Sequence, residues 1–373
     1  MNATDLQSIL GSFLCREHRL SSRQWQVCSH IQACRTAALG GLQLHCDHCD
    51  YDVPQYHACR DRHCPRCQQR ASRRWCEQQQ AAVLPVSYYH LVFTLPHTLN
   101  PWVQLHPQVI YGLLFQSVWA TLKTFAADPK RLGGELGVTA VLHTWGQNLS
   151  QHVHLHCLIP GGVLNPAGQW QQAKGNYLFP VRALSRVFRG KMVSALSAAS
   201  REGELHRITR PGDVDNTLDS LMQAEWVVYS KACVSHTESV VAYLARYSHR
   251  IAISDRRILG LEGDQVVFCY KDYRDHDKSK VMRLSGVEFI RRFMLHVLPK
   301  GFMRLRHYGF LANRCREEKL RQIRGVLAPG GEPPTASADV TPDEPFAGYP
   351  CPKCRQGMVH VAYPLAPMHW GGG

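Results

Sequence analysis

The segment HVHLHC at residues 152–157 alternates histidines with apolar residues, and no other feature limits the fold of this chain so narrowly. Successive side chains of a β-strand point to opposite faces, so the three histidines would share one face. Residues 138–145 read as a second strand, and the polar stretch GQNLSQ between the two segments is typical of a turn. We therefore predict an antiparallel hairpin with one apolar face and one face rich in histidine.

Placing the turn at residues 147–150 gives one register, in which the opposed residues are His143 with His154, Val141 with His156, and Trp145 with His152. A slip of one residue would destroy this grouping, so the register is itself a prediction. The histidine face could bind a divalent cation, although imidazole alone does not select the metal. The alternative is a polar face exposed to solvent. The opposite face would be buried and consists of Ala140, Leu142, Val153, Leu155, Cys157 and Ile159.

A second candidate segment, residues 236–250, has the composition of a helix that begins near Thr237. Tyr243 and Tyr247 are four residues apart and would share one side of that helix. Arg246 and Arg250 each follow one of these tyrosines by three residues. Guanidinium groups can hold phosphate oxygens while a phenolate attacks phosphorus. A phenol with a pKa of about 10 would need a metal or a base at neutral pH, and ordinary helix packing is the alternative.

Four cysteines follow the pattern C-x2-C-x14-C-x2-C, namely Cys46, Cys49, Cys64 and Cys67. This spacing predicts a four-cysteine zinc site, and the ion would supply folding energy that a short segment cannot gain from burial. A second ion could use Cys34, Cys59 and His63, or these residues could simply pack locally, and spacing does not decide between the two. Cys351 and Cys354 form half a site, which His360, His369 or another chain could complete.

The chain carries a net positive charge. Lys and Arg number 43 against 29 Asp and Glu, an excess of +14 that is typical of proteins with a polyanionic partner such as nucleic acid. A basic enzyme without such a partner is the alternative, and charge alone does not decide between the two. Arg62 lies just before the second cysteine pair and Arg66 lies within it, where they could contact the DNA backbone or form a solvated basic face. Residues 328–345 are rich in Pro, Gly and acid and read as a linker. No apolar run could span a bilayer and no signal peptide is evident, so we expect a cytoplasmic protein.

These features resemble the HUH endonucleases, and most closely the two-tyrosine transposases of prokaryotic rolling-circle insertion sequences, which carry an N-terminal zinc-binding domain. The resemblance covers nearly the whole chain. It rests on the segments CRTAALGG (34–41), CRDRHCPRCQ (59–68), HLVFTLPHTL (90–99), VLHTWGQNLSQHVHLHCLIPGG (141–162), YLARYSHRIAIS (243–254), YKDYR (270–274) and FIRRFMLHVLPKGFMRLRHYG (289–309). Two departures are HVHLH, where the family usually has HPHxH, and the C-terminal YPLAPMHWGGG, which matches no pattern of the family.

The resemblance implies an α+β fold in three parts. Residues 1–84 would form a small zinc-binding, DNA-binding domain. Residues 85–327 would form the HUH nuclease core, a central antiparallel sheet flanked by helices, and residues 328–373 a linker and CxxC tail. The paired histidines of the family map to His154 and His156, which would hold Mg or Mn over the scissile phosphate. We choose His143 as the third ligand from the predicted hairpin.

The resemblance further implies that Tyr243 and Tyr247 cut single-stranded DNA, leaving a 5′-phosphotyrosine and a free 3′-OH. Arg246 and Arg250 would contact that DNA. Such transesterification conserves the phosphodiester energy, in agreement with the lack of an ATP-binding motif. The partners would be single-stranded DNA at the ends of a mobile element and target DNA, which would associate the protein with the nucleoid.

Three other functions compete with this one. A plasmid or phage replication initiator, or a relaxase, could use the same core, and transposition assays would separate these from a transposase. A zinc-ribbon DNA-binding regulator without catalysis predicts that His154→Ala and Tyr243→Phe leave function intact. A metal-dependent hydrolase of small phosphate esters would have no need of the paired tyrosines.

Overall fold

The computed structural model describes residues 4–15, 19–68, 83–173, 175, 178–210, 212–233, 251–273, 275–328 and 348–368. The chain forms two compact units. The first comprises residues 1–71, 253–297 and 335–373, and the second comprises residues 72–252 and 298–334.

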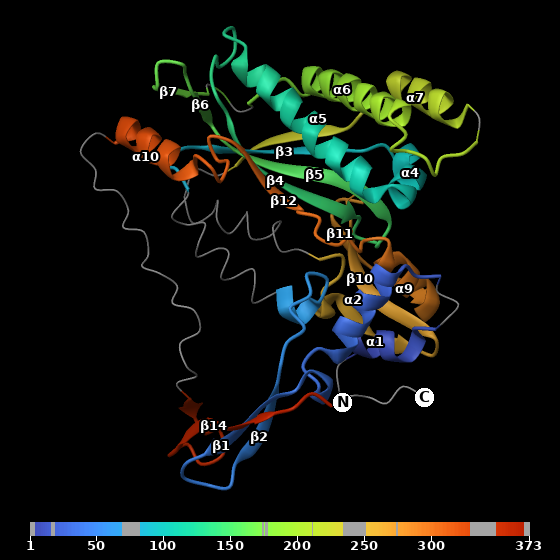
Figure 1. Ribbon diagram of the computed structural model, residues 1–373, viewed down its shortest axis with the longest axis vertical. Helices are drawn as coiled ribbons and strands as arrows, with labels where there is room; N and C mark the ends of the chain where they lie inside the picture. Colours follow the sequence, from blue (N-terminus) through green and yellow to red (C-terminus); the bar gives the residue numbers. More distant parts are fainter. Residues whose placement is uncertain are drawn as a thin grey trace. The chain divides into compact units, whose positions relative to one another are not determined.

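A five-stranded sheet forms the centre of the second unit (Figure 1). Its strands, in spatial order, are β12 (Leu305–Gly309), β4 (Gly137–Trp145), β5 (Gln151–Pro160), β3 (Tyr88–Thr94) and β8 (Val228–Cys233). Every neighbouring pair is antiparallel. The structure therefore confirms the predicted α+β class and the central antiparallel sheet.

Helices cover one face of this sheet (Figure 1). They are α5 (Pro107–Ala127), α6 (Val181–Arg201) and α7 (Asp213–Gln223), with the shorter η2 (His97–Leu99) and α4 (Asn100–Leu105) before them. All six apolar residues predicted for the inner face of the hairpin belong to the same hydrophobic core as Phe115 and Phe188 of α5 and α6. Full burial of each large apolar side chain stabilises the fold by about 1.5–3 kcal/mol. The apolar face of the hairpin is thus held against the helices, and the histidines point to the other face.

A smaller core lies at one end of the second unit. It joins Leu158 of β5 with Phe310 and with Ile323 of α10 (Arg316–Leu327). A two-stranded sheet of β6 (Gly162–Leu164) and β7 (Trp170–Gln172) lies beside it. Gly309, which ends β12, has φ +61°, and a Cβ there would overlap the carbonyl of Leu136. Only glycine fits this approach of two backbones.

The first unit begins with α1 (Leu6–Phe13), α2 (Ser22–Ala33) and η1 (Ala37–Leu39). A second part of the chain packs on them, consisting of η3 (Asp255–Arg257), β9 (Ile258–Glu262), β10 (Gln265–Asp272), β11 (Lys278–Ser285) and α9 (Gly286–Met294). The ring of Phe13 occupies the space where a Cβ of Gly286 would lie. The backbone N–H of Leu6 donates to Oδ1 of Asp255 at 3.1 Å, which joins α1 to the start of the second part.

A four-stranded sheet in the first unit joins two strands from residues 41–56 with two strands from residues 349–365 (Figure 1). Its spatial order is β13 (Tyr349–Pro350), β14 (Met358–Leu365), β1 (Gly41–Cys46) and β2 (Asp52–Tyr56). The first compact unit thus combines stretches from different parts of the sequence, and the three consecutive segments expected from the sequence stay a prediction. The C-terminal tail pairs with a strand of the predicted N-terminal domain, and residues 253–297, expected in the nuclease core, pack on the N-terminal helices.

Candidate metal centres

The hairpin of β4 and β5 has the predicted register over most of its length. His143 lies opposite His154, and Val141 lies opposite His156. The predicted pair of Trp145 with His152 is wrong, because the register shifts after His143 and Trp145 faces Gln151. Such a β-bulge adds one residue to one strand. The turn that follows has five residues, 146–150, closed by a hydrogen bond from the N–H of Gly146 to the carbonyl of Ser150.

Three histidines of this hairpin meet at one point. One ring nitrogen from each of His143, His154 and His156 lies within 4.8 Å of the others. The ring centroids of His143 and His156 are 4.4 Å apart, and those of His154 and His156 are 4.8 Å apart. His143 is buried, with 2% of its surface exposed, while the other two are half-buried. His152 shares their face but lies outside the group.

Hydrogen bonds orient two of these rings. Nδ1 of His154 lies 2.8 Å from the carbonyl oxygen of His152, so Nδ1–H donates and Nε2 keeps its lone pair. Nδ1 of His156 lies 2.8 Å from Nε2 of His90, and the two rings are stacked. A metal-bound imidazole commonly donates its other N–H to such a partner. In that tautomer His156 donates to His90 and offers Nε2 to an ion.

His90, on β3, is suited to accept this proton. Burial, and then the positive charge of Lys231, lower the pKa of His90 to about 4. His90 is therefore neutral at physiological pH, and one of its ring nitrogens is an acceptor. Sequence reasoning missed His90. The alternation of YYHLVFTL places it on one face with Val92 and Thr94, but only the pairing of β3 with β5 shows that this is the histidine face.

The donor set fits a divalent cation with open coordination positions. Three imidazoles on adjacent strands approach from one side, and the group includes no carboxylate among the described residues. Imidazole ligands alone do not select one first-row divalent ion, whereas Mg²⁺ prefers oxygen ligands. The arrangement of His143, His154 and His156 thus agrees with a catalytic ion more readily than with a closed structural site.

The predicted zinc ligands are grouped differently from the expectation. Cys64 and Cys67 lie with Cys34 and Cys59, and the other predicted pair lies with two cysteines of the C-terminal tail. The single site of Cys46, Cys49, Cys64 and Cys67 is therefore corrected to two clusters. Spacing reveals the local CxxC turn, but it does not show which pair of cysteines a tertiary fold brings to face it.

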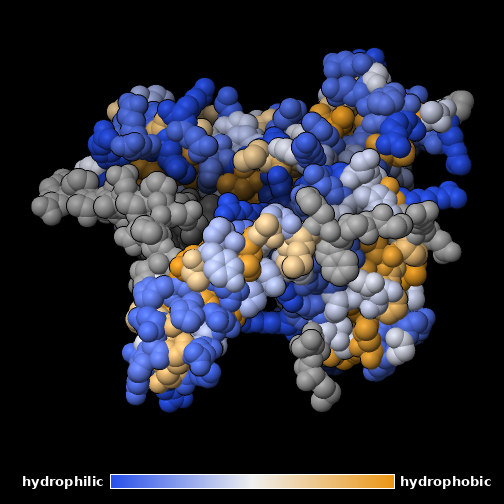
Figure 2. All heavy atoms as spheres, turned by 60° about the horizontal axis from the view of Figure 1, so that its bottom comes forward, coloured by the Kyte–Doolittle hydropathy of each residue, from blue (hydrophilic) through white to orange (hydrophobic). Residues whose placement is uncertain are grey.

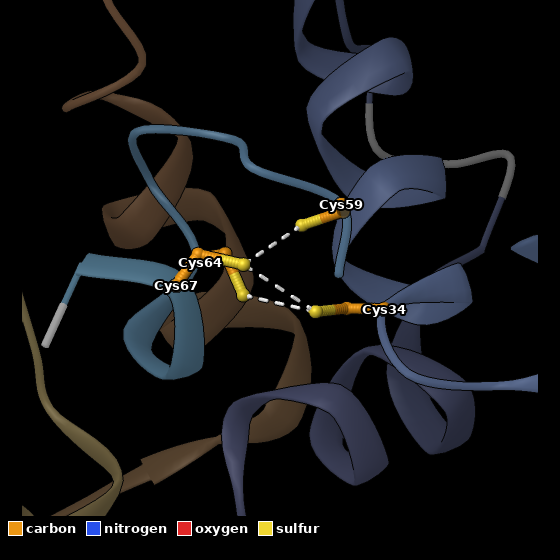
Figure 3. A group of neighbouring side chains, drawn as sticks. All are labelled: Cys34, Cys59, Cys64 and Cys67. Atoms are coloured by element: carbon orange, nitrogen blue, oxygen red, sulfur yellow. Dashed lines mark hydrogen bonds between the residues drawn. The ribbon is translucent and has the colours of Figure 1, made fainter. Parts of the chain in front are cut away.

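The first cluster has the dimensions of a zinc site (Figure 3). Cys34 follows the end of α2, and its sulfur points toward those of the other three cysteines (Figure 3). Cys67 Sγ lies 3.6 Å from the sulfurs of Cys34 and Cys59, and Cys64 Sγ lies 3.7 Å from that of Cys34. Four sulfurs about 2.3 Å from a tetrahedral ion are separated by about 3.8 Å, so these residues fit structural zinc.

Tyr243, Tyr247, Arg246 and Arg250 lie outside the described residues. Of the other predicted DNA contacts, Arg62 and Arg66 are half-buried, and Arg66 forms an ion pair with Asp5 that occupies part of its guanidinium.

Comparison with known proteins relates these sites to a family. The chain is 45% identical over 356 residues to a protein of Sinorhizobium fredii named "Putative transposase y4qJ", covering 91% of this chain and 89% of that protein. The chain belongs to the same family of transposases. The transposase for insertion sequence element IS801 of Pseudomonas savastanoi pv. phaseolicola is 28% identical over 372 residues, covering 94% of this chain and 86% of that protein.

Two sequence families match separate parts of this transposase. One, described as "Transposase zinc-binding domain", matches residues 6–95, and the other, described as "Putative transposase", matches residues 137–319. The first match contains all four cysteines of the cluster in Figure 3, and the second contains the histidine hairpin. The predictions of a transposase and of an N-terminal zinc-binding domain are confirmed.

Hydrophilic side chains cover most of the described surface in the view of Figure 2, and hydrophobic ones form smaller patches between them. Among the described helices, none combines the length and the apolar character that crossing a bilayer requires.

Proposed function

We propose that this transposase nicks single-stranded DNA at the ends of its mobile element and transfers the strand through a phosphotyrosine intermediate. His143, His154 and His156 would hold a divalent cation at the scissile phosphate, and Tyr243 and Tyr247 would be the nucleophiles. The convergence of the three ring nitrogens within 4.8 Å, with two rings oriented by hydrogen bonds, is the observation that carries the proposal. The assignment of the tyrosines rests on the family resemblance.

The chemistry is an in-line exchange of one phosphoester for another. A tyrosine oxygen forms a bond to phosphorus while the bond from phosphorus to the 3′-oxygen breaks, and the leaving oxygen takes up a proton. A bound cation would supply electrostatic stabilisation of the charge that develops on the phosphate. A 3′-OH from another strand can reverse the step, which returns the phenol and joins the two strands. No nucleotide is consumed.

Two tyrosines allow two covalent DNA strands to be held in turn. Arg246 and Arg250, three residues after each phenol, would neutralise the neighbouring phosphates. With one tyrosine, the enzyme would have to complete one transfer before beginning the next. We therefore expect the single variants Tyr243→Phe and Tyr247→Phe to lose transposition, even where one of them retains nicking.

Nicking of a labelled oligonucleotide with the sequence of the element's end tests this proposal. We expect cleavage of the single strand with Mn²⁺, little cleavage of the same sequence as a duplex, and none with chelator. His154→Ala should lose at least a hundredfold in rate, whereas His152→Ala, on the same face outside the group, should stay within a few-fold of the wild type. Equal rates for His154→Ala and the wild type would overturn the assignment of the metal site. Equal cleavage of the duplex would overturn the single-strand specificity.

A further inference from the structure

We propose that Cys46, Cys49, Cys351 and Cys354 bind a second structural zinc ion, which fastens the C-terminal tail into the N-terminal domain. The match to the zinc-binding family ends at residue 95 and so contains only half of these ligands. Cys49 and Cys351 are 302 positions apart in the chain. The site is therefore split between the two ends of the protein.

The sulfur positions have the dimensions of a four-thiolate site. Sγ of Cys46 lies 3.8 Å from Sγ of Cys354, and Sγ of Cys49 lies 3.8 Å from Sγ of Cys351. These distances equal the edge of about 3.8 Å expected for four sulfurs about 2.3 Å from zinc. Cys46 and Cys351 are buried at 0% and 1% exposure, and none of the four cysteines forms a disulfide. Four thiolates without another ligand type favour zinc over oxygen-binding cations.

A backbone N–H donates to one sulfur of each CxxC pair. The N–H of His48 donates to Sγ of Cys46, and the N–H of Gly357 donates to Sγ of Cys354, both at 3.4 Å. Such bonds favour the thiolate form that a metal requires. A Cβ on Gly357 would lie 2.9 Å from Sγ of Cys46, so glycine lets the second turn approach the first.

The sheet around these turns has very little core of its own. Its cluster of buried residues consists of Leu44, Cys46, Cys351 and Val359 in the part of the chain that the structure describes. Two fully buried aliphatic side chains contribute about 3–6 kcal/mol, far less than the entropy of ordering four strands. Small modules with so little core are commonly held by a metal or by disulfides. Zinc binding would supply the missing free energy.

The ion would hold the C-terminal tail in the sheet, where it pairs with β1. β14 pairs with β1 from Gly41 opposite Leu365 to Cys46 opposite Val359, so the tail forms part of the sheet rather than a free extension. This site can be completed only after residue 354 has been synthesised. A C-terminal deletion would then damage the N-terminal domain, although the two are at opposite ends of the sequence.

Zinc content provides the first test. The number of zinc ions per chain is measured after dialysis against a weak chelator. The protein carries His154→Ala, so that zinc bound at the histidine cluster does not add to the count. We expect two zinc ions per chain, and one after Cys351→Ser with Cys354→Ser. The control, Cys269→Ser with Cys315→Ser, removes two cysteines outside both clusters and should keep two ions. One ion in the parent, or two in the Cys351/Cys354 variant, would overturn the proposal.

Retention of the tail provides a second test that uses the native cysteines. A specific protease site is inserted between residues 329 and 347, and the folded, zinc-loaded protein is cleaved there under reducing conditions. We expect the C-terminal fragment to stay with the body during gel filtration and to separate from it after a strong chelator is added. Separation before chelation, or retention after complete removal of zinc, would contradict the proposal.

Discussion

Nε2 of His90 lies 2.8 Å from Nδ1 of His156, and the two stacked imidazoles join the neighbouring strands β3 and β5. This contact fixes the ring of one proposed metal ligand from outside the metal site. Loss of such a partner typically costs 10–100-fold in metal affinity.

We therefore expect His90→Phe to weaken Mn²⁺ binding by about 10–100-fold without unfolding the protein. His90→Gln should recover part of the loss, because an amide oxygen can accept the proton of His156 Nδ1. Calorimetric titration with Mn²⁺ measures both. Equal affinities for wild type and His90→Phe would show that the contact does not position the ligand.

The assignment of the third ligand can be tested separately. His143→Ala should lower Mn²⁺ affinity at least tenfold, because the ion would keep only two imidazoles. The matched variant is His152→Ala, because His152 is on the same face but outside the group, and the variant keeps the backbone carbonyl that accepts from His154. Electron paramagnetic resonance of free Mn²⁺ reports the binding. An unchanged affinity in His143→Ala would assign the third position to another residue.

Acid should destabilise the second unit through His307. Burial, and then the charge of Arg316, lower the pKa of His307 to about 4, below about 6.5 in an unfolded chain. The unfolded chain therefore binds the proton more readily, and stability falls as the pH drops from about 6.5 to about 4. The loss is on the order of 3 kcal/mol at most.

Urea unfolding at pH 7 and at pH 4.5 measures this loss. His307→Gln keeps a polar group near Thr139, whose hydroxyl lies 3.0 Å from Nδ1 of His307, and removes the titration. Its unfolding free energy should depend less on pH than that of the wild type. Parallel pH curves for the two proteins would be inconsistent with the lowered pKa.

Zinc binding at the first cluster should depend on Cys34 and not on Cys28, the buried cysteine in α2. Cys34→Ser should release one zinc ion and unfold the N-terminal helices, because Sγ of Cys34 lies within 3.7 Å of two partner sulfurs. Cys28→Ser provides the control, since Cys28 is equally buried but contacts Met294 and no cysteine cluster. It should retain all its zinc at a packing cost of about 1 kcal/mol. Zinc analysis and circular dichroism distinguish the two results.

The histidine hairpin could be predicted because its information is local. The alternation of histidine and apolar residues assigned the two faces of the hairpin. The short polar turn predicted the register that places His143 opposite His154. The prediction failed only beyond that pair, where the shift at Trp145 accompanies a five-residue turn with Leu149 at φ +62°. The sequence pattern carries no indication of that backbone conformation, which L-residues seldom adopt.

The grouping of the cysteines could not be predicted for a different reason. Each CxxC turn can be read from the sequence, but the partner of each turn depends on strand pairing across the whole chain. Cys34 joins Cys64 and Cys67 because α2 ends beside them, and Cys351 joins Cys49 because β14 pairs with β1. His90 was missed for the same reason.

The central claim is that DNA becomes covalently attached to a phenol of this transposase with the help of the histidine cluster. The most direct measurement is to incubate the protein with labelled single-stranded DNA of the element's end and Mn²⁺, and to identify the modified peptide in the denaturant-resistant adduct. We expect the DNA on Tyr243 or Tyr247, and no adduct with the double Phe variant or with His154→Ala. An adduct on any other residue, or an undiminished adduct in the double Phe variant, would contradict the claim.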